Sequence, residues 1–310
     1  METAGAIVIF IAILIGLLPS FLMVGLGGMI RRRLSVNAWQ GLDKLNFEIL
    51  FPALLFVSAA GRPIQFGDLF AMAPAVWSIL TLGLGLGYLT RRFGPDRFLD
   101  FAGAWQTAWR FNSAIGLVAI ATLADGNAAQ MAVAIGLAVP VANVFAVSAL
   151  SRGGSLSLLD SAKKVALNPF LVASVAGVVV GLSGLTIPVP VLAPLQMLAA
   201  AAIPIALISV GATMNWSALG KLDLFSGAIN AVKLVVLPAV TLGVCLTFGV
   251  RADLAVVLVI FAALPTASAA HVLASGFGAD RELVATLVAQ STLLAAITLP
   301  IWITVAAVLL

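Results

Sequence analysis

The sequence predicts an all-α polytopic membrane protein whose ten transmembrane helices form two inverted repeats of five, with helices 4 and 9 broken where they cross. Three observations lead to this fold class. Of the 310 residues, 62% are hydrophobic and only 9% are charged, whereas a soluble domain carries about 25% charged residues. Apolar runs of the length that a membrane-spanning helix needs recur along the whole chain. The longest polar segment divides these runs into five and five.

The ten expected helices are the apolar runs that lie between clusters of charged and turn residues. The run at 6–28 lacks the basic start of a signal peptide, so we expect it to be retained as the first helix. The run at 45–60 is short, and we expect it either to begin earlier or to bend at Pro52. The other eight runs are 69–89, 101–123, 129–150, 167–186, 192–214, 224–248, 254–275 and 283–309.

Lysine and arginine residues are distributed unequally between the two sets of loops. The loops after the odd-numbered helices carry twelve of them, whereas the loops after the even-numbered helices carry only Arg62 and Arg251. Because positive residues favour the cytoplasmic side, we expect an inner-membrane protein with both termini extracytoplasmic. The basic residues then act as topology signals in a lipid bilayer, and the net charge of +4 gives no indication of a nucleic-acid partner.

The chain is expected to have three parts. Residues 1–150 form the first five-helix repeat, residues 151–166 a cytoplasmic linker, and residues 167–310 the second repeat. An odd number of helices in each half forces the second half into the opposite orientation. Weak internal similarity agrees with this, since Glu48–Leu55 resembles Ala200–Leu207. Inverted repeats of this kind are typical of transporters.

The fourth helix of each half carries capping or helix-breaking residues near its middle. Asn112 and Thr266 are suitable N-caps for a second half-helix, and Pro265 lacks a backbone donor. We expect the two breaks to meet, so that two positive helix ends and free amides form a site for a carboxylate. Ser113 and Ser268 lie beside these residues and join the substrate-binding candidates. The alternative is that both helices are merely kinked.

Four ionisable residues within the expected helices are candidates for function, because charge at membrane depth is costly. Arg110 is a candidate to bind a carboxylate in bidentate fashion, to pair with Glu48, or to extend to the cytoplasmic interface. Glu48 could carry a coupling proton or pair with Lys44 or Arg110. Lys233 is a candidate counter-ion to Glu48 or a neighbour of the anion path. His271 could titrate near neutrality or only hydrogen-bond between helices.

Further polar residues are candidates to line a cavity or to hydrogen-bond between helices, namely Asn143, Gln290, Ser291, Gln106, Asn230 and Thr292. No cofactor or metal site is expected, because the chain has one cysteine and one histidine. Motifs for nucleotide binding, serine hydrolysis or zinc proteolysis are missing, which disfavours an ATP-driven pump and an intramembrane enzyme. A sodium-coupled symporter and a passive channel stay open as alternatives.

Several blocks of sequence, in this order along the chain, resemble the auxin efflux carrier family, whose bacterial members include malonate and malate permease-like proteins. The blocks are Lys44–Phe56 (KLNFEILFPALLF), Arg110–Leu117 (RFNSAIGL), Ala202–Gly211 (AIPIALISVG), Lys233–Pro238 (KLVVLP) and Ala263–Ala274 (ALPTASAAHVLA). The resemblance implies a fold related to plant PIN auxin transporters and bile acid/sodium symporters. It also implies secondary active transport of small organic anions by an elevator-like movement, coupling to protons or sodium, and a homodimer.

The resemblance also assigns roles to parts of the chain. It implies a scaffold of helices 1, 2, 6 and 7. By motif position, Asn112 is the polar residue of the first break, while Pro265 and Thr266 form the second. The family usually has a second asparagine shortly after Pro265 and Thr266, where this chain has Ser268, Ala269 and Ala270. The polar pair at the crossing is therefore incomplete.

Overall fold

The computed structural model describes residues 2–60, 66–121, 123, 128–151, 167, 169–267 and 270–310. All regular secondary structure in these residues is helical. The α-helices are α1 (Glu2–Ile30), α2 (Val36–Leu45), α3 (Phe51–Ala60), α4 (Phe66–Tyr88), α5 (Phe98–Trp105), α6 (Ser113–Ala121), α7 (Ala128–Ser151), α9 (Pro169–Ser183), α10 (Val189–Thr213), α11 (Leu224–Ala231), α12 (Leu237–Thr247), α13 (Ala252–Ala263), α14 (Ala270–Gly276) and α15 (Arg281–Leu309).

Shorter helical segments connect or extend these helices. They are the π-helical η1 (Asn46–Leu50) and η5 (Val232–Val236), and the 3-10 helices η2 (Leu89–Phe93), η3 (Gln106–Ala108) and η4 (Ala218–Lys221).

Each of the ten apolar runs contains helix, which confirms the all-helical fold class. Among the described residues, five helical stretches are long and apolar enough to cross a membrane. They are Met72–Phe93, Ala128–Ser151, Val189–Thr213, Leu224–Thr247 and Arg281–Leu309. The expected short second run does begin earlier, because α2, η1 and α3 follow one another from Val36 to Ala60 without a gap.

The two π-helical segments have a common local cause. Each ends two residues before a proline, η1 before Pro52 and η5 before Pro238. A proline has no amide to donate and its ring crowds the carbonyl four residues earlier, so a wider turn relieves the helix at that point. At Pro238 the carbonyl left without its helical donor is that of Leu234. It accepts a hydrogen bond of 2.8 Å from Trp302 Nε1 of α15 instead.

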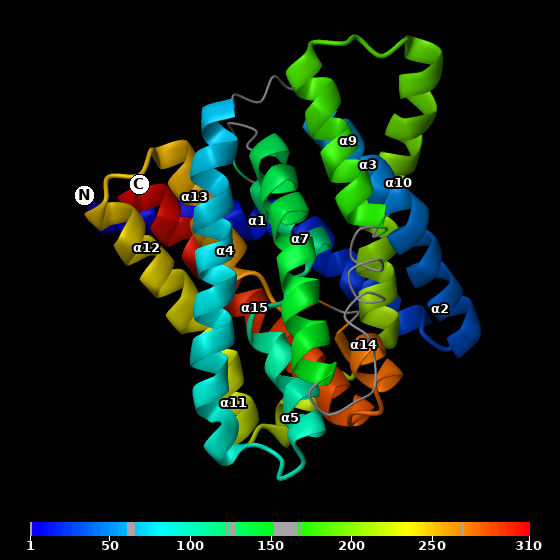
Figure 1. Ribbon diagram of the computed structural model, residues 1–310, viewed down its shortest axis with the longest axis vertical. Coiled ribbons are helices and arrows are strands. Elements are labelled where there is room, and N and C mark those ends of the chain that lie inside the picture. Colours follow the sequence, from blue (N-terminus) through cyan, green and yellow to red (C-terminus); the bar gives the residue numbers. More distant parts are fainter. Residues whose placement is uncertain are drawn as a thin grey trace.

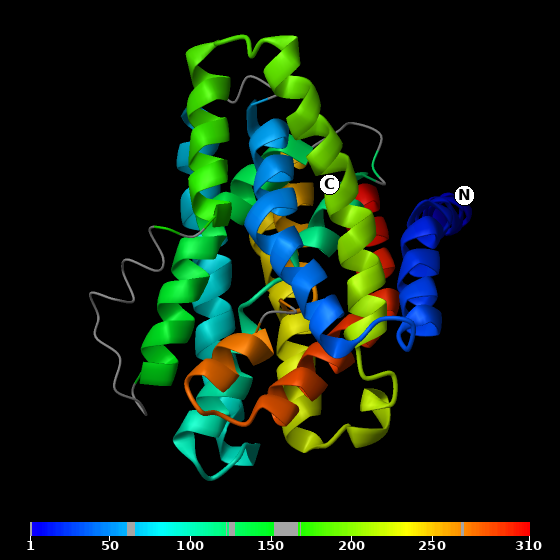
Figure 2. The ribbon, with the colours of Figure 1, turned by 90° about the vertical axis from the view of Figure 1, so that its right-hand side faces the viewer.

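The helices gather in two groups (Figure 1). On one side lie α2, α3, α9 and α10, and on the other lie α4, α11, α12 and α13, while α7 lies between them and contacts α4, α9 and α3. The most extensive helix pairings are α1 with α10 and α3 with α9, and Figure 2 shows α9, α3 and α10 side by side with α1 next to α10.

Glycines allow α1 and α10 to approach closely. A Cβ atom on Gly27 would overlap the carbonyl of Ile208, and one on Gly211 would overlap the carbonyl of Val24. Small residues let helix backbones touch in this way in membrane proteins. The packing of α1 on α10 therefore depends on the absence of a side chain at both positions.

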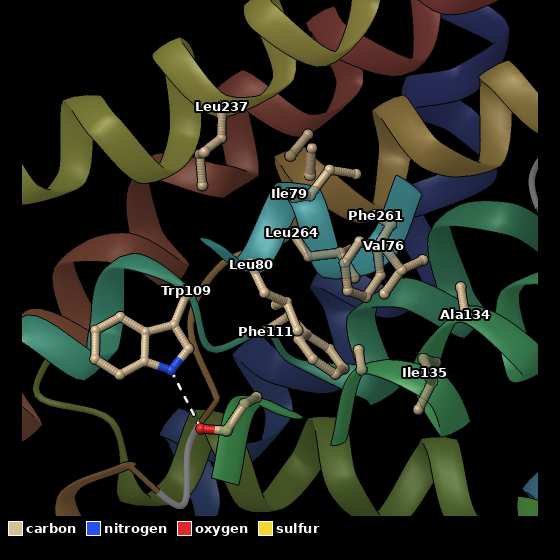
Figure 3. Close-up of a cluster of buried hydrophobic side chains, with 14 of the residues drawn as sticks. Val76, Ile79, Leu80, Trp109, Phe111, Ala134, Ile135, Leu237, Phe261 and Leu264 are labelled. Atoms are coloured by element: carbon tan, nitrogen blue, oxygen red, sulfur yellow. Dashed lines mark hydrogen bonds between the residues drawn. The ribbon is translucent and has the colours of Figure 1, made fainter. Parts of the chain in front are cut away.

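Aromatic side chains fix the chain where α5 and η3 end (Figure 3). Trp109 and Phe111 are both buried. The indole Nε1 of Trp109 donates a 3.2 Å hydrogen bond to the carbonyl of Ala142 on α7. The ring of Phe111 packs against Phe261 of α13, with 4.7 Å between the ring centroids. These contacts anchor the residues on both sides of Arg110, which lies between the two rings in sequence.

Candidate functional site

The first helix break lies between η3, which ends at Ala108, and α6, which begins at Ser113. Asn112 is buried, with 6% of its surface exposed. Its Oδ1 atom accepts a 3.2 Å hydrogen bond from the amide of Ile115, three residues further on. This is the geometry of an N-cap, so the predicted capping role of Asn112 is confirmed. Ser113 forms the first residue of α6 and is partly buried.

The second break follows α13, which ends at Ala263, and precedes α14, which begins at Ala270. Pro265 and Thr266 are buried in this break. The amide of Thr266 donates to Ser291 Oγ at 3.3 Å, which brings Ser291 of α15 to the break. The Thr266 hydroxyl has no hydrogen-bond partner in the described part of the chain. A capping bond would be donated by residues 268 and 269, which lie outside the described residues, as does the candidate Ser268.

The two breaks are in direct contact although they are far apart in sequence. The amide of Asn112 donates a 2.8 Å hydrogen bond to the carbonyl of Pro265. Gln106 Nε2, at the end of the first half-helix, donates to the carbonyl of Ala270 at 3.2 Å. The backbone of one break therefore supplies a partner for the other.

Arg110 lies two residues before the Asn112 cap and is held by neutral amides. Its Nη1 atom donates to Gln106 Oε1 at 2.9 Å, and its Nη2 atom donates to Asn143 Oδ1 of α7 at 2.7 Å. The side chain is partly exposed. A guanidinium has five N–H donors. Within the described residues no carboxylate forms an ion pair with Arg110, so a cation with spare donors lies next to the crossing.

Lys233 is a second cation near the crossing. Only 2% of its surface is exposed, and its Nζ atom lies 3.3 Å from the carbonyl oxygen of Ala262, close to the end of α13. It belongs to the π-helical η5. Glu48 is not its counter-ion, and neither is it the partner of Arg110. Glu48 is exposed and pairs with Lys44 at 3.8 Å on the α2–η1 segment, which belongs to the other group of helices.

Gln290 and His271 take no part in the hydrogen bond between Asn112 and Pro265. Gln290 Oε1 accepts a hydrogen bond from Asn230 Nδ2 of α11 at 3.3 Å. Gln290 Nε2 donates to the carbonyl of Ala218 in η4 at 3.0 Å, so Gln290 connects α15 with α11 and η4. His271 follows Ala270 in the first turn of α14 and is partly buried. His271 interacts electrostatically with the carboxylate of Asp43 on α2.

Two polar contacts between α2–η1 and α10 were not anticipated from the sequence. The hydroxyl of Ser209 donates to the carboxylate of Asp43, and Asn46 Nδ2 donates to the carbonyl of Ala202 at 3.0 Å. Asp43 precedes the apolar run at 45–60, so run length gives no reason to place it in a helix. Asn46 lies in one of the quoted sequence blocks, which was its only signal. Both contacts join helices within one group, and the Asp43 carboxylate also interacts electrostatically with His271 of α14.

Comparison with known proteins gives consistent matches. Residues 155–303 match the family described as membrane transport protein. A putative malonate transporter of Rhizobium meliloti is 26% identical over 300 residues, which cover 91% of this chain and 92% of the relative. An uncharacterized transporter of Methanothermobacter thermautotrophicus is 28% identical over 302 residues, covering 91% and 95%. The family match and both relatives point to a membrane transporter, and they support the auxin efflux carrier family that the sequence blocks resemble.

Proposed function

We propose that this transporter carries small carboxylates across the membrane as a secondary active carrier, with the substrate bound where the two helix breaks meet. The observation that carries this proposal is the Arg110 guanidinium. It is held by two neutral amide oxygens, without a described carboxylate partner, two residues from the hydrogen bond between Asn112 and Pro265.

The electrostatics of the first break favour an anion. The first amides of α6, those of Ser113 and Ala114, have no carbonyl within the helix to bond to. The N-terminal end of a helix carries about half a positive charge. Backbone amides at such an end bind anions, and an arginine fork matches the geometry of a carboxylate. A dianion such as malonate could use both groups, and one relative is named a putative malonate transporter.

The packing pattern supports the inverted repeat as part of the proposal. If helix 1 corresponds to helix 6 and helix 2 to helix 7, the pairing of α1 with α10 corresponds to the pairing of α9 with α3. We propose ten spans with both termini extracytoplasmic and the repeats at 1–150 and 167–310. The helices α1, α2, α3, α9 and α10 then form the scaffold, and the crossing moves against it, as alternating access requires.

Transport assays in liposomes test this function. We expect saturable currents on solid-supported membranes after jumps of malonate, malate or short monocarboxylates, with indole-3-acetate included in the panel. Radiolabelled exchange across the same liposomes detects electroneutral transport that gives no current. Saturation and counterflow identify a carrier. A flux that does not saturate and shows no counterflow would indicate a channel, and no flux of any carboxylate in either assay would refute the proposal.

Substitutions at Asn112 separate its capping role from substrate binding. Asn112→Asp keeps an oxygen that caps the Ile115 amide, so we expect its unfolding temperature to stay within about 3 °C of the wild type. The added negative charge repels a carboxylate, and we expect its uptake to fall at least about tenfold. Asn112→Ser is the matched control, since it also caps the helix but adds no charge. Uptake by Asn112→Asp at the wild-type rate would place the substrate elsewhere.

A further inference from the structure

The side chain of Lys233 reaches the carbonyl end of α13. The amide of Thr266 would continue the helix by bonding to Ala262, but it donates to Ser291 Oγ instead. The carbonyl of Ala262 is thus left without a helical partner, and Lys233 Nζ lies 3.3 Å from it. The C-terminal end of a helix carries about half a negative charge. The ammonium therefore lies where the field of α13 favours a cation.

The surroundings of Lys233 do not compensate for the free-energy cost of burying a charge there. The side chain is buried, its neighbours Leu234 and Leu237 are buried and apolar, and no ion pair joins it to a carboxylate in the described ranges. Removing an ammonium from water is expensive unless it is paired. A charge kept at such cost within a membrane indicates a functional role.

The first break has a different arrangement at the corresponding carbonyl end. The carbonyl of Ala108 lies where η3 ends, and Gly83 of α4 approaches it so closely that an added Cβ would lie 2.9 Å from its oxygen. The backbone of Gly83 therefore packs against the carbonyl end of η3. Among the described contacts of the two half-helix ends, a lysine side chain is present at the end of α13 and not at the end of η3.

We propose that the Lys233 ammonium is the built-in cation of the crossing. In transporters with broken helices, half-helix carbonyl ends coordinate the coupling ion, and here a covalently attached ammonium occupies that position at α13. It follows that anion transport by this chain needs no sodium at this end of the crossing. This consequence for coupling rests on the proposed function, whereas the occupation of a cation position does not.

Thermal unfolding of purified Lys233→Ala in detergent tests the position without any transported substrate. The substitution removes a group equal in size to n-propylammonium. We expect the variant to unfold about 2 °C or more higher in n-propylammonium chloride or sodium chloride than in choline chloride at equal ionic strength, because bound cation stabilises the folded state. The wild type should unfold at the same temperature in all three salts. Lys221→Ala, which removes an exposed lysine paired with Glu282, is the control and should show no salt preference.

Two outcomes would overturn the proposal. One is a Lys233→Ala variant that responds equally to all three salts, and the other is a wild type that sodium stabilises over choline. A second variant, Lys233→Met, tests the proposal if Lys233→Ala does not fold, because methionine fills the same space without a charge. We expect Lys233→Met to fold but to exchange carboxylate at least about tenfold more slowly than the wild type. Exchange at the wild-type rate would refute a role for the ammonium. Should the wild type transport no carboxylate at all, the proposed function fails, while the thermal result for Lys233→Ala still decides the cation position.

Discussion

Replacing Arg110 with glutamine is expected to weaken carboxylate binding by about 2 to 5 kcal/mol, which is 30-fold or more in affinity. The loss arises because the guanidinium belongs to the residue two positions before Asn112, and its hydrogen bonds to Gln106 and Asn143 leave donors for a substrate. Calorimetric titration of the purified protein with malonate measures the effect directly.

The stability of the Arg110→Gln variant should not fall with its affinity. The substitution removes a partly buried cation that has no described carboxylate partner, and losing such a charge relieves desolvation. Arg97→Gln is the matched control, because Arg97 is exposed and pairs with Asp100 at 3.5 Å on the surface. We expect it to bind malonate as the wild type does. Equal affinities of Arg110→Gln and the wild type would remove Arg110 from the site.

Gly27→Ala is expected to destabilise the protein severely. The added methyl group would overlap the carbonyl of Ile208, a backbone atom that can move only if α1 separates from α10. Overpacking of this kind costs about 1–3 kcal/mol and sometimes more. We expect a fall in unfolding temperature of about 5 °C or more, or failure to purify as a monodisperse protein.

Gly25→Ala provides the control on the same helix. No atom lies within 4 Å of a Cβ at Gly25, and alanine is the better helix former. Its unfolding temperature should therefore equal or exceed that of the wild type. If Gly27→Ala and Gly25→Ala had the same unfolding temperature, the close approach of α1 and α10 would not exist in the membrane.

The helical elements could be predicted from the sequence because apolar run length is a local property. The breaks at 109–112 and 264–267 could also be predicted from the sequence, since Asn112 and Pro265 are local signals for a helix cap and a helix break. The start of the second helix was uncertain by several residues, because α2 is polar on much of its surface and its continuation through η1 depends on packing against α10. Pro52 alone could not show that a π-helical turn precedes it.

The contacts of the charged residues could not be predicted. The sequence allowed Glu48 to pair with Arg110 or with Lys233, because it gives no distance between helices. In the structure Glu48 stays with its neighbour Lys44, and the two cations bond to amide and carbonyl oxygens instead. The sequence signal for the Arg110 contact is local, since Gln106 lies four residues earlier and its carbonyl also accepts from the Arg110 amide. The Lys233 contact depends on η5 and on the end of α13, which only the fold brings together.

An experimental structure of the protein saturated with malonate tests the central claim most directly. The account predicts density for the dicarboxylate within hydrogen-bonding distance of the Arg110 guanidinium and of the first amides of α6, next to the bond between Asn112 and Pro265. The same protein prepared without malonate is the reference for that density. Malonate density at any other place, with none at the contact between the breaks, would contradict the account.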